Sequence, residues 1–116
     1  MENYLNIVHK ALDDKFGEDI KIIDLRGVSA FTDYFVITNG NSAAQVRAIA
    51  DEAAEKLAAA GLRMKSSEGH SGASWILLDF GDIIVHVFDK TSREYYNLER
   101  VWGDAPVVPM DTPGGN

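Results

Sequence analysis

Two short apolar runs separated by Gly81 and Asp82 form the most regular pattern in the chain: WILLDF at 75–80 and IIVHVFD at 83–89. Both runs are rich in β-branched and aromatic residues, which favour strands. Gly-Asp between them indicates a two-residue turn, because tight primed turns need a residue that accepts positive φ. The pattern predicts an antiparallel hairpin over 74–89 in which Phe80 faces Ile83.

Alternation along this hairpin predicts two faces of different chemistry. If Leu78 meets Val85 and Ile76 meets Val87, one face is wholly apolar and must be buried. The opposite face is mixed, and it combines a large aromatic, a carboxylate and an imidazole. Its residues are Trp75, Leu77, Asp79, Ile84, His86 and Phe88.

Helical periodicity appears in three other segments. Apolar residues recur at helical spacing from Leu5 to Phe16, and Gly17 is a suitable C-cap, which predicts a helix over 3–16. Ser42 and Gln45 have the spacing of a capping box, so a second helix begins at Ser42 and ends at Gly61. Its expected buried stripe consists of Val46, Ile49, Ala50, Ala53 and Leu57.

A second capping-box pattern, TSRE at 91–94, predicts a short third helix through Trp102 that ends at Gly103. Further strands are expected at 20–25 and 34–38, with an edge strand at 62–66 and a mobile polar loop at 67–73. A strand-helix-strand crossover favours parallel neighbours, whereas a two-residue hairpin is antiparallel. The predicted class is therefore α/β, with a mixed sheet of about five strands and flanking helices.

Composition limits the possible functions. A chain of 116 residues with 46% hydrophobic content is long enough for one domain, expected at 1–108, with a disordered tail at 109–116. The net charge of −7 argues against a primary contact with nucleic-acid phosphates and favours a basic protein partner. Cysteine is absent, and the sequence has neither a secretion signal nor an apolar run of membrane-spanning length. These features predict a cytoplasmic protein.

Candidate catalytic and metal-binding groups do not form a recognised motif. The loop 39–42 before the second helix can present amides to an anion, but it matches neither G-x-G-x-x-G nor the P-loop, so a plain helix cap is the favoured interpretation. Ser29, Ser42 and Ser71 lie outside any G-x-S-x-G elbow. An acidic and imidazole set lacks tight metal-ligand spacing and is compatible with structural hydrogen bonds. This set is Asp79, Asp82, His86 and His70. No catalytic residue, cofactor or metal is predicted.

The aromatic residues of the C-terminal half allow two interpretations. Tyr96 and Trp102 are expected to form a second core beneath the third helix. Trp75 shares its face with Asp79 and stands beside a polar loop, and tryptophan is overrepresented among interface anchors. For Trp75, a core role and a contact role both remain open.

Several ordered motifs resemble the ribosomal silencing factor (Iojap) family, over nearly the whole chain before the tail. They are DLRG at 24–27, TDYFVI at 32–37, QVRAIA at 45–50, EG at 68–69, WILLDFGDIIVHVF at 75–88, REYYNLE at 93–99 and Trp102. The resemblance implies a nucleotidyltransferase-like α/β fold and a homodimer when free. It also implies binding to the large ribosomal subunit at the ribosomal protein numbered fourteen, on the intersubunit face. Small-subunit joining is thereby blocked sterically when nutrients are scarce.

Catalysis does not carry over from that fold. The fold usually has an active-site Gly-Ser followed by a carboxylate pair on the next strand, whereas Asn41 separates Gly40 from Ser42 here and the segment 62–66 has no carboxylate.

Two hypotheses follow for the function. In the first, the protein is a binding module and not an enzyme. Its predicted partner-binding residues are Trp75, Leu77, Asp79, Asp82, Ile84 and His86. In the alternative, it is a small nucleotidyl- or phosphoryl-transferase that uses Gly40, Ser42 and the Asp79-Asp82 pair.

Overall fold

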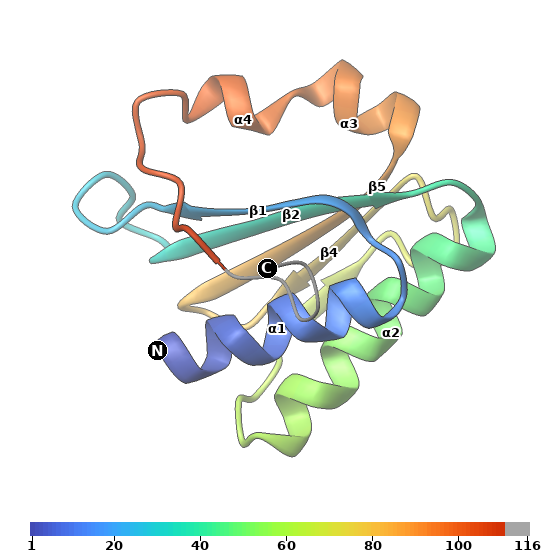
Figure 1. Cartoon of the computed structure of the whole chain (residues 1–116), viewed down its shortest axis with the longest axis horizontal. Coiled ribbons are helices and arrows are strands. Elements are labelled where there is room, and N and C mark those ends of the chain that lie inside the picture. The colour runs from blue at the N-terminus through green and yellow to red at the C-terminus, as the bar shows by residue number, and fades with distance from the viewer. Residues whose placement is uncertain (111–116) are drawn as a thin grey trace.

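A five-stranded mixed sheet lies between two helical layers in the computed structural model, which describes residues 1–110 (Figure 1). The strands are β1 (Glu18–Asp24), β2 (Tyr34–Gly40), β3 (Ser66–Glu68), β4 (Trp75–Asp79) and β5 (Ile83–Asp89). The helices are α1 (Glu2–Asp14), α2 (Ala43–Ala59), α3 (Lys90–Tyr96) and α4 (Leu98–Val101). The sheet order is β1-β2-β5-β4-β3, and only the β2–β5 pair is parallel among these strands. The predicted α/β class with a mixed sheet is confirmed.

The central hairpin has the predicted register. Leu78 pairs with Val85 and Ile76 with Val87, and the amide of Phe80 donates to the carbonyl of Ile83 at 2.9 Å. Gly81 adopts a φ of 88°, the left-handed conformation that the two-residue turn requires. Local turn chemistry therefore fixes the alignment of β4 and β5.

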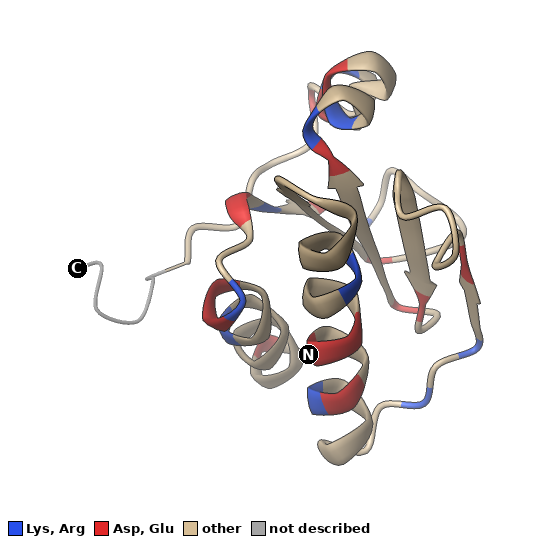
Figure 2. Cartoon of the chain, turned by 90° about the vertical axis from the view of Figure 1, so that its right-hand side faces the viewer, with Lys and Arg blue, Asp and Glu red and all other residues tan. Residues whose placement is uncertain are grey.

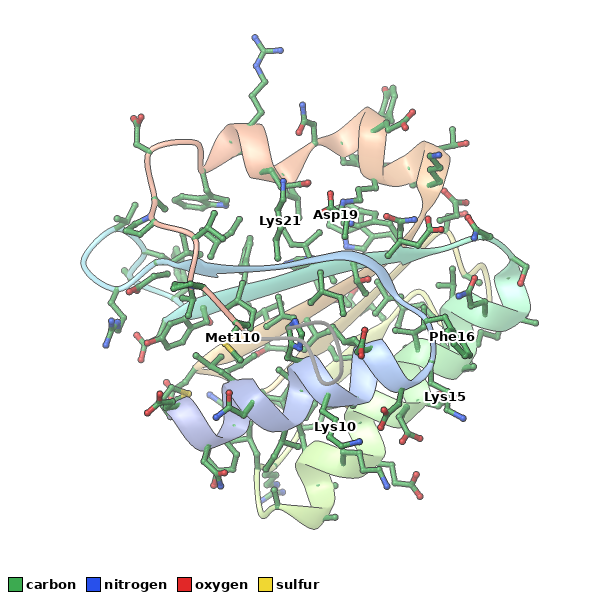
Figure 3. The ribbon with its side chains drawn as sticks, viewed as in Figure 1. Lys10, Lys15, Phe16, Asp19, Lys21 and Met110 are labelled. Carbon is green, nitrogen blue, oxygen red and sulfur yellow. The ribbon has the colours of Figure 1, made fainter. Side chains whose placement is uncertain are left out.

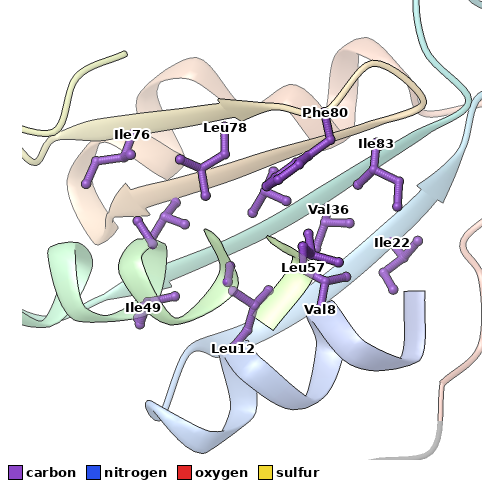
Figure 4. Packing of buried hydrophobic residues seen from close by; sticks show 14 of the residues in the cluster. Val8, Leu12, Ile22, Val36, Ile49, Leu57, Ile76, Leu78, Phe80 and Ile83 are labelled. Atoms are coloured by element: carbon purple, nitrogen blue, oxygen red, sulfur yellow. The ribbon is translucent and has the colours of Figure 1, made fainter. Parts of the chain in front are cut away.

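The apolar face of the sheet packs against α1 and α2 and forms the larger core (Figure 4). Ile76, Leu78 and Phe80 of the hairpin lie in it together with Val8 and Leu12 of α1. Ser42 caps α2 by accepting a hydrogen bond from the amide of Gln45 at 3.0 Å. The whole predicted stripe of α2 is buried: Val46, Ile49, Ala50, Ala53 and Leu57.

The opposite face of the sheet carries a smaller core beneath α3 and α4. Its buried members are Ile23, Leu25, Ile37 and Phe88. Trp102 packs against them, as predicted, whereas Tyr96 is 47% exposed and so was wrongly assigned to this core. Because α3 packs over β2 and β5, the β4 side of this face remains partly exposed.

The predicted extension of the first helix to Phe16 is wrong. The first helix ends at Asp14, and Phe16 adopts a φ of 63° with 80% of its surface exposed, at the turn into β1 (Figure 3). The amide of Gly17 donates to the carbonyl of Leu12 at 2.9 Å. A Cβ on Gly17 would lie 2.8 Å from Oγ1 of Thr38. The close approach of β2 thus reverses the chain here and turns Phe16 outward.

Two other predicted boundaries are also wrong. The edge strand comprises 66–68 instead of 62–66. The amide of Lys65 donates a hydrogen bond to the carbonyl of Asp79 at 2.7 Å, and this bond sets the register of the strand against β4. The third helix begins at Lys90, and its N-cap is Asp89, whose side chain accepts from the amide of Ser92 at 2.7 Å, instead of the first residue of the TSRE pattern. Asn97, at φ 47° and ψ 58°, divides this helix into α3 and α4.

The crossover through α2 does not join neighbouring strands. It leads from β2 to β3 at the far edge of the sheet, and the hairpin then places β5 beside β2 as its parallel partner. The predicted parallel pairing is therefore present, but between different strands.

The C-terminal segment extends the sheet at the edge of β1. The carbonyl of Pro106 accepts from the amide of Asp24 at 2.8 Å, and the amide of Val108 donates to the carbonyl of Ile22 at 2.8 Å. Met110, which the sequence analysis assigns to the tail, packs against the larger core (Figure 3). The remainder of that tail, 111–116, lies outside the described residues. Within 1–110, no helix combines the length and the apolar character needed to cross a membrane.

Candidate functional site

The partly exposed half of the second sheet face brings most of the predicted contact residues together. We use the term hairpin face for Trp75, Leu77, Asp79, Asp82 and Ile84. Four of these side chains are partly exposed on one side of β4 and β5, and Asp82 is exposed in the turn. Charged residues of the two strands are restricted to their last positions, so the strands are otherwise free of charge (Figure 2). The hairpin face therefore combines an apolar centre with acidic residues at one end.

An open hollow of about 340 Å³ lies beside Trp75 and Leu77 and is also lined by Glu68 and Gly69. Gly69 adopts a φ of 85°, and a Cβ there would lie 2.0 Å from the carbonyl oxygen of Trp75. Only glycine fits this approach without moving the backbone. Gly69 thereby allows the loop to close tightly against the start of β4.

The indole of Trp75 packs against the ring of Phe88 on β5 and that of Tyr96 on α3. Its centroid is 5.0 Å from that of Phe88 and 4.7 Å from that of Tyr96. Nε1 of Trp75 donates to Nδ1 of His86 at 3.0 Å. Because this nitrogen is the only hydrogen-bonding group of the side chain, Trp75 offers a partner apolar surface. Trp75 is thus both packed and partly exposed, which combines the two roles left open by the sequence.

His86 lies on the same side of the hairpin as the residues of the hairpin face but is buried. Its side chain is 3% exposed, and its ring centroid is 4.4 Å from that of Phe35. Burial lowers the pKa of His86 to about 4 because desolvation disfavours the imidazolium. The neutral ring accepts from Trp75 at Nδ1, so its proton is on Nε2, a buried atom without a hydrogen-bond partner among the described residues.

The lowered pKa of His86 predicts a pH dependence of stability. The unfolded chain takes up a proton near pH 6.5, whereas the folded chain resists it until about pH 4, so stability is full above 6.5 and falls as the pH decreases. The expected slope is at most about 1.4 kcal/mol per pH unit, or about 2 kcal/mol between pH 7 and 5. Urea unfolding of wild type and His86→Leu at several pH values measures this slope. The difference between the two proteins isolates His86, since the other titrating groups are common to both. Parallel curves for the two proteins would contradict the prediction.

The two aspartates of the hairpin also support its turn. Oδ1 of Asp79 accepts from the amide of Gly81 at 2.8 Å. The carbonyl of Asp82 accepts from the amides of Asp33 and Tyr34, both at 3.0 Å. A substitution of Asp79 that removes only its charge must therefore retain the acceptor oxygen, as asparagine does.

The groups required by the transferase alternative lie at opposite ends of the sheet. Gly40 pairs with Asp89, whereas Asp79 pairs with Ile84, five residues away along β5. Five residues of strand span about 16 Å at roughly 3.3 Å per residue. Gly40 and Ser42 therefore do not form a common site with Asp79 and Asp82, and that constellation is wrong.

Two side chains of the loop at 39–42 are hydrogen-bonded to a carboxylate of the same chain, that of Glu18. The side-chain amides of Asn39 and Asn41 donate to Glu18, at 2.9 and 3.0 Å. The hydrogen bonds from Asn41, and then from Asn39, lower the pKa of Glu18. The polar loop thus ties β2 to the start of β1.

The imidazole and acidic set of the sequence analysis is likewise dispersed. His70 lies in the loop before β4, where its Nε2 is 3.0 Å from Oδ1 of Asp51 on α2. Arg47 of α2 donates to the carbonyls of His70 and Ser71, so the loop predicted to be mobile is attached to the helix. Within 1–110, no three His, Asp or Glu side chains are grouped closely enough to hold a metal ion.

No local pattern in the sequence marks the buried Arg93, which anchors α3. It is 6% exposed and donates to the carbonyls of Glu18 and Asp19 at 3.1 and 2.8 Å, and to Oδ1 of Asn39 at 2.9 Å. Its guanidinium also pairs with Glu99 at 3.0 Å. Because α3 carries Tyr96, this network fixes the ring that packs on Trp75.

Comparison with known proteins assigns the chain to a family. Residues 1–115 match the family model described as "Ribosomal silencing factor during starvation". The chain belongs to the ribosomal silencing factor family. It is 47% identical over 110 residues to the ribosomal silencing factor of Bacillus subtilis (strain 168), which covers 95% of this chain and 93% of that protein. The resemblance inferred from the sequence motifs is confirmed.

Further similar proteins come from a plant and from two bacteria. The chain is 33% identical over 105 residues to "Protein Iojap, chloroplastic" of Zea mays, covering 89% of this chain and 46% of that protein. A crystal structure from Bacillus halodurans superposes with a TM-score of 0.84 at 40% identity, covering 95% of this chain and 100% of that one. A crystal structure from Chromobacterium violaceum superposes with a TM-score of 0.86 at 31% identity, covering 98% of this chain and 96% of that one.

Proposed function

We propose that the protein binds the large ribosomal subunit through the hairpin face and sterically blocks joining of the small subunit when nutrients are limiting. The contact is with a basic ribosomal protein on the intersubunit face, the one numbered fourteen. The observation that carries the proposal is the partly exposed Trp75, which is held by other rings beside a hollow lined by Leu77 and Gly69. Family membership supplies the ribosome as the target.

Two physical features support this surface as the contact. Interface energy is concentrated in a few large anchors, often tryptophan, that are surrounded by other contacts that exclude water. The acidic residues Glu68, Asp79 and Asp82 lie on or beside the hairpin face, in a chain of net charge −7. Opposite charge steers a basic partner to this surface and fixes its register.

The proposed mechanism needs occupancy and no chemistry. A protein that covers part of the intersubunit face inhibits in proportion to the fraction of subunits that it occupies. We also propose that the free protein is a homodimer in the cytoplasm, that nucleic acid is not its primary contact, and that it acts as a regulator without a cofactor.

Sucrose-gradient sedimentation with isolated ribosomal subunits tests the proposal. The protein should migrate with the large subunit and not with the small one. Inhibition of subunit joining should saturate at about one copy per large subunit, because each copy covers one site. Inhibition at far lower ratios that grows with time would instead indicate turnover by an enzyme.

Replacing Trp75 by alanine should weaken large-subunit binding at least about thirtyfold, which corresponds to about 2 kcal/mol. The cost in folding stability should be below the 3–5 kcal/mol typical of a fully buried large aromatic, since the indole is only partly buried. Sedimentation measures binding and urea unfolding measures stability. Phe16→Ala removes an exposed aromatic at the turn after α1 and should change neither. Normal binding by Trp75→Ala would exclude the hairpin face as the contact.

A further inference from the structure

The hydrogen bond between Trp75 and His86 joins the partly exposed contact surface to a buried residue on the same face of the sheet. Trp75 pairs with Phe88 and Leu77 pairs with His86, so the indole and the imidazole are diagonal neighbours on one face of the hairpin. Nε1 of Trp75 can only donate, and Nδ1 of His86 accepts it at 3.0 Å. This bond requires a neutral imidazole whose proton is on Nε2.

The burial of His86 needs a reason beyond packing. The imidazole is 3% exposed, and Nε2 has no hydrogen-bond partner within the described part of the chain. A buried donor without a partner costs free energy, and a leucine at this position would remove that cost. The imidazole makes one side-chain hydrogen bond within the described residues, to Trp75, and an apolar residue could not make it.

The surroundings keep the imidazole neutral without help from a charged group. Phe35 of β2 contacts the ring, and Ile37 of β2 is its paired neighbour, so β2 contributes no charge. On β4, Asp79 shares this face, and its Oδ1 is bound to the amide of Gly81. On α3, the ring of Tyr96 packs on the rings of Trp75 and Phe88. On α4, Glu99 is held by Arg93 and Arg100 is exposed.

We propose that His86 is a positioning residue for the partner contact: its Nδ1 fixes the indole of Trp75 in the orientation that the large subunit meets. This inference rests on the proposed function and deepens it. A partly exposed side chain that is already ordered loses less rotational freedom on binding, so the affinity is higher. Protonation of His86 would replace the acceptor by a donor and release the indole.

Two variants separate positioning from a structural role. His86→Leu removes the acceptor together with the unpartnered Nε2–H, and should be at least as stable as wild type. His86→Asn keeps an acceptor oxygen at the place of Nδ1 but buries an amide, and should be less stable. Binding should follow the opposite order: His86→Leu weakens large-subunit binding roughly fivefold, and His86→Asn recovers most of this loss. Affinities that follow stability would overturn the inference.

The indole N–H resonance of Trp75 gives a readout that does not involve the ribosome. The chain has two tryptophans, and Trp102→Phe identifies the signal of Trp75. In wild type this proton should exchange slowly with water, and its shift should follow the titration of His86. In His86→Leu the exchange should be fast, and the pH-dependent shift should disappear. An unchanged exchange rate in His86→Leu would overturn the inference.

Failure of the inference can be told apart from failure of the proposed function in the same sedimentation assay. If wild type does not bind the large subunit, or if Trp75→Ala binds normally, the proposed function fails and the inference with it. If Trp75→Ala binds weakly while His86→Leu binds as tightly as wild type, only the inference fails. Weak binding by both variants, with recovery in His86→Asn, supports both.

Discussion

Ile76→Asp should leave the domain unfolded at 25 °C. The Ile76 side chain is fully buried between the hairpin and the helices α1 and α2 (Figure 4). A carboxylate there would lose its hydration without gaining a partner, in addition to the packing lost with the isoleucine. The lost packing costs about 2–5 kcal/mol and the unpaired buried carboxylate several more, which together approach or exceed a typical total stability of about 5–15 kcal/mol. Circular dichroism should show no cooperative melting transition.

The neighbouring position supplies the matched control, because Leu77 points to the opposite face of the same strand. Leu77→Asp should cost about 1 kcal/mol of stability, since the side chain is partly exposed and the carboxylate keeps contact with water. It should nevertheless weaken binding to the large subunit. A cooperative transition in Ile76→Asp, similar to that of Leu77→Asp, would contradict the burial of the apolar face.

Arg93→Ala should destabilise the protein by about 3–5 kcal/mol, the range observed when one partner of a buried pair is removed. The truncation removes the guanidinium donors to the carbonyls of Glu18 and Asp19 and to Oδ1 of Asn39, and of these three acceptors the Glu18 carbonyl alone keeps another side-chain donor in the described part of the chain, the hydroxyl of Thr38. It also leaves Glu99 without its partner in a partly buried pair. Urea unfolding measures the loss.

Two further variants, Arg93→Lys and Arg100→Ala, test whether the loss of stability comes from the hydrogen-bond network of Arg93. Arg93→Lys should also lose most of this stability, because an ammonium cannot reproduce the fork of donors that reaches two strands and α4. Arg100→Ala removes an exposed arginine from α4 and should change stability by less than about 0.5 kcal/mol. Equal midpoints for Arg93→Ala and Arg100→Ala would show that the network does not anchor α3.

The accuracy of the sequence predictions depended on how local the decisive contacts are. The hairpin register was predictable because Gly81 and the alternation around it specify it within sixteen residues. The stripe of α2 was predictable because its period and its cap at Ser42 lie within one segment. The edge strand β3 was misplaced because all three of its residues are exposed, so no apolar pattern marks it.

The sequence predicted which residues share one side of the hairpin, but not which of them are buried. Alternation correctly grouped Trp75, Leu77, Asp79 and Ile84 on one side of the hairpin. It could not reveal that His86 is covered, because the cover comes from Phe35 and from the C-terminal helices. Nor could it exclude the transferase constellation, since the distance between Gly40 and Asp79 follows from the strand order.

The sequence by itself determined the α/β class, the hairpin, the apolar face beneath it and the family, because each depends on short-range periodicity or on ordered motifs. Only the tertiary structure decided which strands are parallel, how Arg93 joins α3 to β1 across 75 residues of sequence, and which hairpin residues remain exposed. Those features depend on contacts between segments far apart in the chain. Such contacts are chosen by the packing of the whole domain, and no local pattern encodes them.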